Sequence, residues 1–430
     1  MQMRIREITD RLKRSTLFRD SLWAVCGNGF GNALLLFAGI WIARLLGKDL
    51  YGEYGVVKTN MFYMAGLSTF GLVYSSTRYI ATYLASDKTR IPGVIRNATR
   101  ITFAFSTLIA IALSLAAPRI ETFLETPGIA PVFRMLSVII VFKALASTGN
   151  GILAGLGKFS LIAKSNVVSG ALMFALCVPL TYFAGLYGAL FSLAVSQLVN
   201  AAVNYWYICG ESRRLPIYCY CEDSVGSLLR FSFPIALQEI SYALCNWCGI
   251  LMLTKLSSLS EVGLYSASVQ WNAVICLIPG LLANVVLSHL SKTDGAQQQR
   301  LVSRLLAVYL ICTAVPFVLV YLFADVIISF YGADFIDMKR VLHISILATI
   351  PTCCSDVFKA ELIAVGRPWI LFSLRMAKDL ILVSLACYFL LAHGGASGAY
   401  YYTVSNLLSV TLFFIGTAAV YRFVGKQSNG

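Results

Sequence analysis

The chain has 430 residues, of which 58% are hydrophobic and 13% are charged, and its mean hydropathy is +0.75. A soluble protein of this length needs more polar surface than such a composition supplies, so the sequence indicates a polytopic membrane protein. The net charge of +14 does not point to nucleic acid, because the basic residues are scattered between apolar segments and form no nucleic-acid-binding motif.

The first twenty residues, MQMRIREITDRLKRSTLFRD, are charged throughout and lack the apolar core of a cleavable signal peptide. Ile5, Ile8 and Leu12 recur at helical spacing among basic residues. Residues 1–20 are therefore predicted to form a basic amphipathic helix on an anionic membrane surface, with a frayed basic tail as the alternative.

Apolar runs between turn signals predict twelve membrane-spanning helices, since about 20 apolar residues cross a bilayer. The predicted spans are 21–43, 54–80, 99–116, 134–154, 161–184, 188–209, 232–253, 263–286, 302–323, 341–363, 370–391 and 400–420. With the N-terminus inside, the inner segments hold roughly three times as many lysines and arginines as the outer ones. We therefore expect both termini to be cytoplasmic.

The two halves of the sequence resemble each other at an offset of about 210 residues. YGEYG at residue 51 matches VGLYS at residue 262, which aligns Gly52 with Gly263, and AGLGKF at residue 154 matches IAVGRPW at residue 363. An offset that covers six spans indicates parallel repeats related by an axis along the membrane normal. The prediction is an all-α membrane protein of about twelve transmembrane helices in two six-helix lobes around a central cavity.

The predicted domains follow this repeat. They are the N-terminal helix (1–20), an N-lobe with helices one to six (21–210), a cytoplasmic linker (211–231), a C-lobe with helices seven to twelve (232–421) and a cytoplasmic tail (422–430). The twelve cysteines fall within spans or inner loops, so no disulfide framework is expected. No P-loop, GxSxG motif or cluster of metal ligands occurs, and we expect a transporter without a catalytic site, a metal or a bound cofactor.

Charged side chains inside the predicted spans are the candidate functional residues. Each costs about 2.5–3.5 kcal/mol at the bilayer centre, so it faces a cavity or a partner. The basic ones are Lys58, Arg78, Lys143, Lys359, Arg375 and Lys378. The acidic ones are Glu239, Asp356, Glu361 and Asp379.

Some of these charges can be explained by internal pairs, because Asp356 precedes Lys359 by three residues and Asp379 follows Arg375 by one helical turn. Lys143 has no acid in its own span, and Lys58 has only Glu53, five residues before it. Removing the pairs leaves an excess of positive charge inside the membrane.

That excess suits an anionic ligand such as a diphosphate, whose charge two or three ammonium or guanidinium groups can match. We therefore take the six basic residues as candidates for a cationic substrate-binding cavity. Glu239 and Asp379 are the candidates for coupling transport to a proton or sodium gradient.

Three features carry a resemblance to a known family. They are the basic N-terminal segment and six-plus-six repeat, the stretch ARLLGKDLYGEYGVV after the first span, and the stretch STFGLVYSSTRYIA at residues 68–81. Together they resemble the Wzx-type polysaccharide and O-antigen repeat-unit flippases of the multidrug/oligosaccharidyl-lipid/polysaccharide exporter superfamily, over essentially the whole chain.

The resemblance implies transfer of an undecaprenyl-diphosphate-linked oligosaccharide from the cytoplasmic to the periplasmic leaflet of a bacterial inner membrane. The transfer would proceed by alternating access and serve the assembly of O-antigen, capsule or exopolysaccharide. Basic cavity residues, here Lys58, Arg78 and Lys143, would meet the diphosphate or acidic sugars. The implied partners are membrane lipids, the lipid-linked glycan and a polysaccharide polymerase or chain-length machinery.

Two other functions stay open. A cation-coupled multidrug exporter of the same superfamily would favour carboxylates around its cationic substrates, but the first span has no acid after Asp20. An integral-membrane glycan polymerase or ligase would need acid–base groups on a sizeable outer loop. The longest predicted outer loops, 117–133 and 324–340, are short and contain no histidine.

Overall fold

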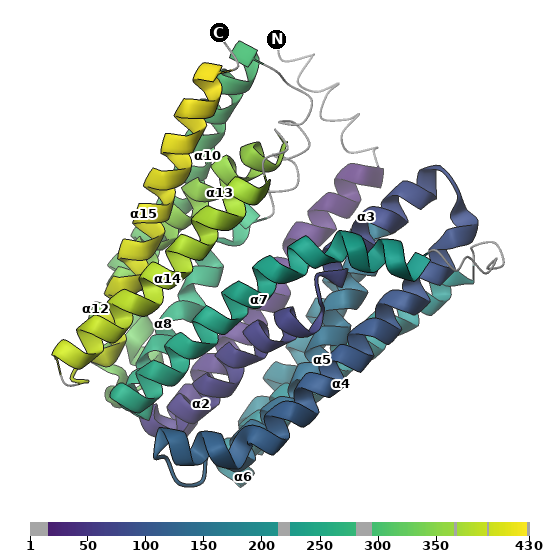
Figure 1. Cartoon of the computed structure of the whole chain (residues 1–430). Coiled ribbons are helices and arrows are strands. Elements are labelled where there is room, and N and C mark those ends of the chain that lie inside the picture. The colour runs from purple at the N-terminus through teal and green to yellow at the C-terminus, as the bar shows by residue number, and fades with distance from the viewer. Residues whose placement is uncertain (1–15, 214–223, 281–294, 365–367, 394, 428–430) are drawn as a thin grey trace, which may run out of the picture. The chain divides into compact units, whose positions relative to one another are not determined.

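The computed structural model describes residues 16–213, 224–280, 295–364, 368–393 and 395–427 (Figure 1). These residues are helical almost throughout and include no strand, which confirms the predicted all-α fold. Most of the predicted N-terminal helix, the middle of the predicted linker and the end of the predicted eighth span lie outside the described residues.

The chain divides into two compact units. Unit 1 consists of Met1–Ala38, Met64–Arg119 and Gly128–Ile240, and unit 2 consists of Gly39–Tyr63, Ile120–Pro127 and Ser241–Gly430. The predicted lobe boundaries stay a prediction, but the membership of unit 2 shows that a segment around the first loop of the sequence packs with the second half of the chain.

The helices of the first half are α2 (Thr16–Ser68), α3 (Leu72–Ala85), η1 (Lys88–Arg90), α4 (Ile91–Leu124), α5 (Ala130–Gly155) and α6 (Phe159–Ser212). The second half begins with α7 (Ser224–Leu256), α8 (Leu259–Ile275), α10 (Gly295–Leu322), α11 (Ala324–Tyr331) and η2 (Ala333–Phe335). It ends with α12 (Met338–Leu347), α13 (Thr349–Ala364), α14 (Pro368–Ala392) and α15 (Gly398–Gln427).

Two of these helices are longer than one predicted span: α6 contains two of them, and α2 contains the first and part of the second. α2 and α6 have 53 and 54 residues, which would extend about 80 Å at 1.5 Å per residue, far more than a bilayer core of about 30 Å. Non-helical backbone at Gly47 (φ 70°) and Gly185 (φ 55°) interrupts them. In α6 the hydroxyl of Ser196 donates to the carbonyl of Ser169 at 3.1 Å, as expected for antiparallel arms folded back at Gly185.

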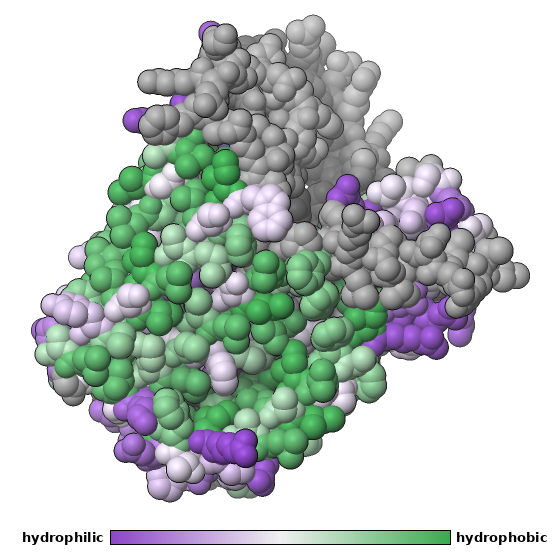
Figure 2. Space-filling view, viewed as in Figure 1, coloured by the Kyte–Doolittle hydropathy of each residue, from purple (hydrophilic) through white to green (hydrophobic). Residues whose placement is uncertain are grey.

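Seven described helices are long and apolar enough to cross a membrane, with α2 and α6 among them. α14 is not in that set because Arg375, Lys378 and Asp379 interrupt its apolar sequence. Hydrophobic side chains dominate the face shown in Figure 2, and strongly hydrophilic ones lie at its edges. Leu115 and Phe183 are 75% and 84% exposed, so hydrocarbon must cover them, and the chain is a multi-pass membrane protein.

Some predicted boundaries were wrong. The predicted span 54–80 is two helices, because α2 ends at Ser68, Phe70 and Gly71 adopt positive φ (49° and 70°), and α3 begins at Leu72. The hydroxyl of Ser68 donates to the carbonyl of Met64 at 2.6 Å and so satisfies an acceptor at the helix end. The predicted span 341–363 is confirmed as one apolar stretch long enough to cross a membrane, Met338–Leu362, although Ala348 interrupts its helix between α12 and α13.

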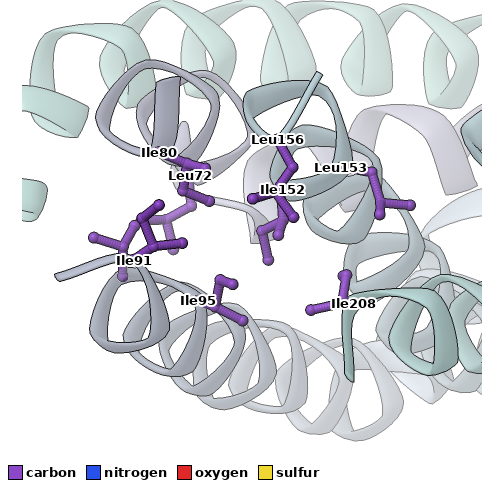
Figure 3. Close-up of a cluster of buried hydrophobic side chains, with 9 residues drawn as sticks. Leu72, Ile80, Ile91, Ile95, Ile152, Leu153, Leu156 and Ile208 are labelled. Carbon is purple, nitrogen blue, oxygen red and sulfur yellow. The ribbon is translucent and has the colours of Figure 1, made fainter. Parts of the chain in front are cut away.

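Apolar clusters hold the helices of each unit together. In unit 1 a cluster joins α3, α4, α5 and α6 (Figure 3). Its members are Leu72, Ile80, Ile91, Val94, Ile95, Ile152, Leu153, Leu156 and Ile208. In unit 2 Tyr309 of α10 packs with Val357 and Phe358 of α13, and Phe414 of α15 packs against them. These contacts position the polar side chains of the same helices.

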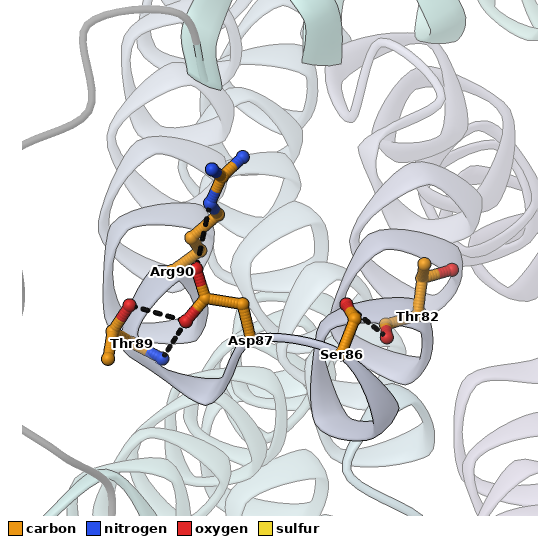
Figure 4. Close-up of polar contacts among 5 residues, drawn as sticks. All are labelled: Thr82, Ser86, Asp87, Thr89 and Arg90. Carbon is orange, nitrogen blue, oxygen red and sulfur yellow. Dashed lines mark hydrogen bonds and ion pairs between the residues drawn. The ribbon is translucent and has the colours of Figure 1, made fainter.

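The turn between α3 and α4 is closed by local polar contacts (Figure 4). Asp87 accepts hydrogen bonds from the amide and the hydroxyl of Thr89, at 3.1 and 2.6 Å, and from Arg90 Nε at 3.1 Å. The Thr89 donors hold the pKa of the Asp87 carboxyl below its usual value. The turn therefore caps η1 and fixes the start of α4.

Candidate substrate-binding site

Two basic side chains of α14 lie over one aromatic ring in unit 2. The guanidinium carbon of Arg375 is 4.6 Å, and Nζ of Lys378 is 5.3 Å, from the ring centroid of Tyr242 in α7. Their three-residue spacing places both on one face of α14. The negative face of the ring offsets part of the cost of burying two cations.

Tyr63 of α2 meets the same ring, with centroids 5.6 Å apart and planes at 81°. Beside this pair, Tyr265 of α8 and Tyr402 of α15 stand edge to face at 4.9 Å. The phenol of Tyr402 is within electrostatic range of Tyr63 and Tyr242. Four helices thus bring tyrosines to the α14 bases, and phenols offer both hydrogen bonds and ring faces to a ligand.

Asp379 completes the group, which we call the basic–aromatic cluster: Arg375, Lys378, Asp379, Tyr242 and Tyr63. Its Oδ1 lies 2.7 Å from Nζ of Lys378, and the Asp379 side chain is 1% exposed. The expectation that Asp379 would pair with Arg375 is therefore corrected: it forms an ion pair with Lys378. Two bases and one acid leave the cluster with a positive charge.

Lys359 is paired within its own helix. Its Nζ lies 2.5 Å from Oδ1 of Asp356 on α13, as the three-residue spacing predicts, and 5.7 Å from the ring centroid of Phe413. Lys359 is also within electrostatic range of Lys378. Because the charge of Lys359 already has a carboxylate partner, we do not count this lysine as a member of the cluster.

Lys58 lies in unit 2 on the second arm of α2. Its Nζ is 5.9 Å from the ring centroid of Tyr54, and a Cβ placed on Gly39 would lie 3.2 Å from it. The absence of a side chain at Gly39 therefore leaves room for Gln270, whose Oε1 is the atom nearest to the added Cβ, and for the Lys58 ammonium group beside it. Among the described side chains, no carboxylate forms an ion pair with Lys58.

The remaining predicted residues lie in unit 1. Arg78 is exposed on α3, Lys143 is half-buried on α5, and Glu239 is half-buried on α7. Gly66 of α2 approaches Glu239, since a Cβ on this glycine would lie 3.9 Å from Glu239 Oε2. Each of the three charged groups makes a further interaction, so none of them is without a partner.

Sequence reasoning missed a chain of amides in unit 1. Asn166 Nδ2 donates to Asn28 Oδ1 at 2.7 Å, and Asn200 Nδ2 donates to Asn166 Oδ1 at 3.0 Å. Asn204 Nδ2 donates to Asn200 Oδ1 at 3.2 Å and to Asn150 Oδ1 at 2.9 Å. The chain ties α2, α5 and both arms of α6 together. Its only sequence signal was the recurrence of asparagine inside apolar runs.

Comparison with known proteins gives the family context. A family model described as "Polysaccharide biosynthesis protein" matches residues 17–293, well over half of the chain. The succinoglycan biosynthesis transport protein ExoT of Rhizobium meliloti (strain 1021) is 22% identical over 268 residues, which cover 62% of this chain. The match spans 52% of that relative, so about half its length is unmatched.

Solved structures share the fold. A multidrug resistance MATE family transporter of the MOP superfamily, in an inward-facing conformation, superposes with a TM-score of 0.75 at 16% identity, over 93% of this chain and 96% of that one. The lipid II flippase MurJ superposes with a TM-score of 0.70 at 16% identity, over 92% of this chain and 87% of that one. A MOP superfamily transporter from Pyrococcus furiosus superposes with a TM-score of 0.62 over 98% of both chains. That protein is described as having a binding pocket of reverse polarity.

Proposed function

This chain belongs to the polysaccharide biosynthesis protein family, and on that premise we propose that it is a flippase for an undecaprenyl-diphosphate-linked oligosaccharide. It moves the glycan headgroup from the cytoplasmic to the periplasmic leaflet of a bacterial inner membrane, with both termini in the cytoplasm. The chain is a transporter and makes or breaks no covalent bond. The product feeds assembly of a surface polysaccharide, whether O-antigen, capsule or exopolysaccharide, by a separate polymerase.

The observation that carries this proposal is the basic–aromatic cluster. Arg375 and Lys378 converge on Tyr242 inside a membrane-embedded unit. With the Lys378–Asp379 ion pair included, the cluster still contains one more base than acid, which suits an anionic ligand. A guanidinium binds two phosphate oxygens at once, and the adjacent ammonium adds a second positive charge. The tyrosines around them suit the sugar that follows the diphosphate.

Lys58 supports the same ligand class independently. It is half-buried on a different helix and forms no ion pair with a described carboxylate. A protein that needed this lysine only for packing would do better with an apolar side chain of similar length. We propose that the diphosphate or an acidic sugar is its partner during transport, and that Arg78 and Lys143 of unit 1 meet the headgroup at another stage of the cycle.

The proposed transport cycle follows from the chemistry of the lipid-linked glycan. The polyprenyl tail stays in hydrocarbon, because moving it into water costs about 0.8 kcal/mol per CH₂ group. The diphosphate and sugars need a hydrated path with positive charge. The protein alternates the opening of that path between the two sides. Protonation or sodium binding at Asp379 or Glu239 is the proposed coupling step.

Reconstitution with a fluorescent diphosphate-linked lipid glycan tests the proposal. The protein is inserted into liposomes, and a membrane-impermeant quencher scores the glycan that has changed leaflet. Arg375→Gln combined with Lys378→Gln should reduce transfer by about tenfold or more, since each lost charge-assisted hydrogen bond is worth about 1.5–3 kcal/mol. Lys339→Gln is the matched control, because Lys339 forms an exposed pair with Asp325 away from the cluster. Equal transfer by all three proteins would refute the assignment of the cluster.

A further inference from the structure

We propose that unit 2 carries a second saccharide-binding site, a pocket where α8, α12 and α15 begin. The pocket has a volume of about 480 Å³ and is lined by Glu261, Asp337, Arg340, Ser397, Tyr400 and Tyr401. Small-molecule sites commonly have volumes of about 300–1,000 Å³. The inference deepens the proposed function, on which it rests: the loops that form the pocket are outer loops in the predicted topology, so the site would receive the glycan as it leaves.

The frame of the pocket is fixed by short-range contacts. Glu261 Oε2 accepts the amide of Ala399 at 2.8 Å, which joins the start of α15 to α8. The hydroxyl of Ser258 accepts the amide of Glu261 at 3.3 Å, and the hydroxyl of Ser257 donates to the carbonyl of Gly395 at 2.6 Å. The starts of α8 and α15 are thereby held together without a ligand. A preformed site loses less entropy when it binds.

Two charged side chains of α12 are open to a ligand. Asp337 and Arg340 are three residues apart and exposed, yet among the described residues neither has an ion-pair or hydrogen-bond partner. Between them they offer carboxylate acceptors and guanidinium donors. Beneath them the side chains of Leu264 and Val341 are each 3% exposed and line the same pocket, so the polar groups sit over an apolar base.

An ordered aromatic group adjoins these charges. The ring of Tyr401 stacks on His393 with centroids 3.9 Å apart, and Tyr400 meets Tyr401 edge to face at 5.3 Å. Phe389, in the last turn of α14, stacks on Tyr401 with ring centroids 5.9 Å apart, and His393 follows directly after that helix. The stack holds both tyrosines at the pocket wall, where their hydroxyl groups add donors and acceptors.

This combination fits a saccharide better than an ion or an apolar drug. Hydrogen-bond donors and acceptors surround the pocket, as a ligand with many hydroxyl groups requires. The tyrosine rings can pack against the apolar C–H face of a sugar. A site for a bare cation would gather oxygen ligands without a guanidinium. A site for a hydrophobic compound would be lined mainly by apolar side chains.

The test uses the glycan that the source cell makes. Mild acid releases the oligosaccharide from the lipid-linked pool, which removes both lipid and diphosphate, and calorimetry measures its binding to the full chain in nanodiscs. Wild-type protein should bind it, and Asp337→Asn or Arg340→Gln should weaken binding by about tenfold or more. Lys339→Gln is the control, since Lys339 neighbours Arg340 in sequence but pairs with Asp325; its binding should equal wild type.

Two results would overturn the site: no binding of the released glycan by wild-type protein, or equal binding by wild type and both pocket variants. The flipping assay with the intact lipid-linked glycan separates this failure from failure of the proposed function. If flipping depends on Arg375 but the free glycan does not bind, only the proposal of the pocket is refuted. If binding of the free glycan depends on Arg340 but no flipping occurs, the proposed flippase function is refuted and the proposal of the pocket is supported.

Discussion

Gly52 of α2 and Gly263 of α8 lie against each other in unit 2: a Cβ placed on Gly263 would be 3.2 Å from the amide nitrogen of Gly52. These two glycines occupy equivalent positions in the internal repeat, 211 residues apart. Thr59 and Ser266 extend the contact with hydroxyls 3.5 Å apart. The repeat-related helices therefore meet at their matching small residues, which lets their backbones approach closely.

This close approach predicts the effect of adding a methyl group. A Cβ on Gly52 would lie 1.8 Å from the carbonyl oxygen of Leu259, so the helices must separate. Gly52→Ala should destabilise the protein by about 1–3 kcal/mol, as overpacking does. Thermal unfolding in detergent would measure it. Gly210→Ala is the control, since nothing lies within 4 Å of its added Cβ; an equal effect of both substitutions would contradict the packing account.

Substitution of Lys58 should reduce transport without reducing stability. Lys58→Gln removes a half-buried charge that has no carboxylate partner among the described residues, so the melting temperature should stay level or rise. Glycan transfer should fall by about tenfold or more if the ammonium binds the headgroup. Lys164→Gln, which removes an exposed charge from α6, should change neither. A marked loss of stability in Lys58→Gln would identify a structural lysine instead.

Tyr242 tests whether the ring or its hydroxyl organises the cluster. Tyr242→Phe keeps the aromatic face beneath Arg375 and Lys378, whereas Tyr242→Leu removes it. A cation–π contact contributes about 0.5–2 kcal/mol. Affinity for the diphosphate-linked glycan, measured by fluorescence titration, should therefore fall more in the Leu variant than in the Phe variant. The reverse order would mean that the phenol hydroxyl is the important group.

The Lys378–Asp379 pair gives a prediction about ion coupling. Asp379→Asn alone leaves Lys378 buried without its carboxylate, which typically costs about 3–5 kcal/mol. The double variant Lys378→Gln, Asp379→Asn removes both charges and should recover most of that stability. If Asp379 couples transport, the folded double variant should lose the stimulation that an imposed pH or sodium gradient gives to wild type. Stimulation that survives there but is lost in Glu239→Gln would move the coupling site to unit 1.

The sequence alone predicts the helical fold well, because apolar segments of span length have few alternatives in a membrane. It does not locate the interruption at Phe70 and Gly71, since a single glycine in an apolar run is compatible with a continuous helix. The hairpin at Gly185 was visible as a boundary between predicted spans. The hairpin at Gly47 was visible for the same reason, with Lys48 and Asp49 beside it.

The candidate site was predictable only in part. Charges stand out in apolar helices, which is why Arg375, Lys378 and Lys58 were found from the sequence. Tyr63 and Tyr242 were not found, because the sequence does not distinguish a tyrosine that packs in a membrane span from one that lines a binding site. The pairing of Asp379 was also assigned to the wrong base, since helical spacing favours Arg375 and only side-chain geometry selects Lys378.

Substrate charge tests the central claim most directly. The same fluorescent glycan can be attached to the same polyprenyl chain through a diphosphate or through an uncharged ether, and both lipids, with a cationic dye, can be offered to wild-type and Arg375→Gln protein in liposomes. We predict rapid transfer of the diphosphate lipid by wild type, a loss of about tenfold or more in Arg375→Gln, and slow transfer of the ether lipid and the dye by both proteins. Equal transfer of the two lipids, or preferential transport of the dye, would contradict recognition of an anionic headgroup.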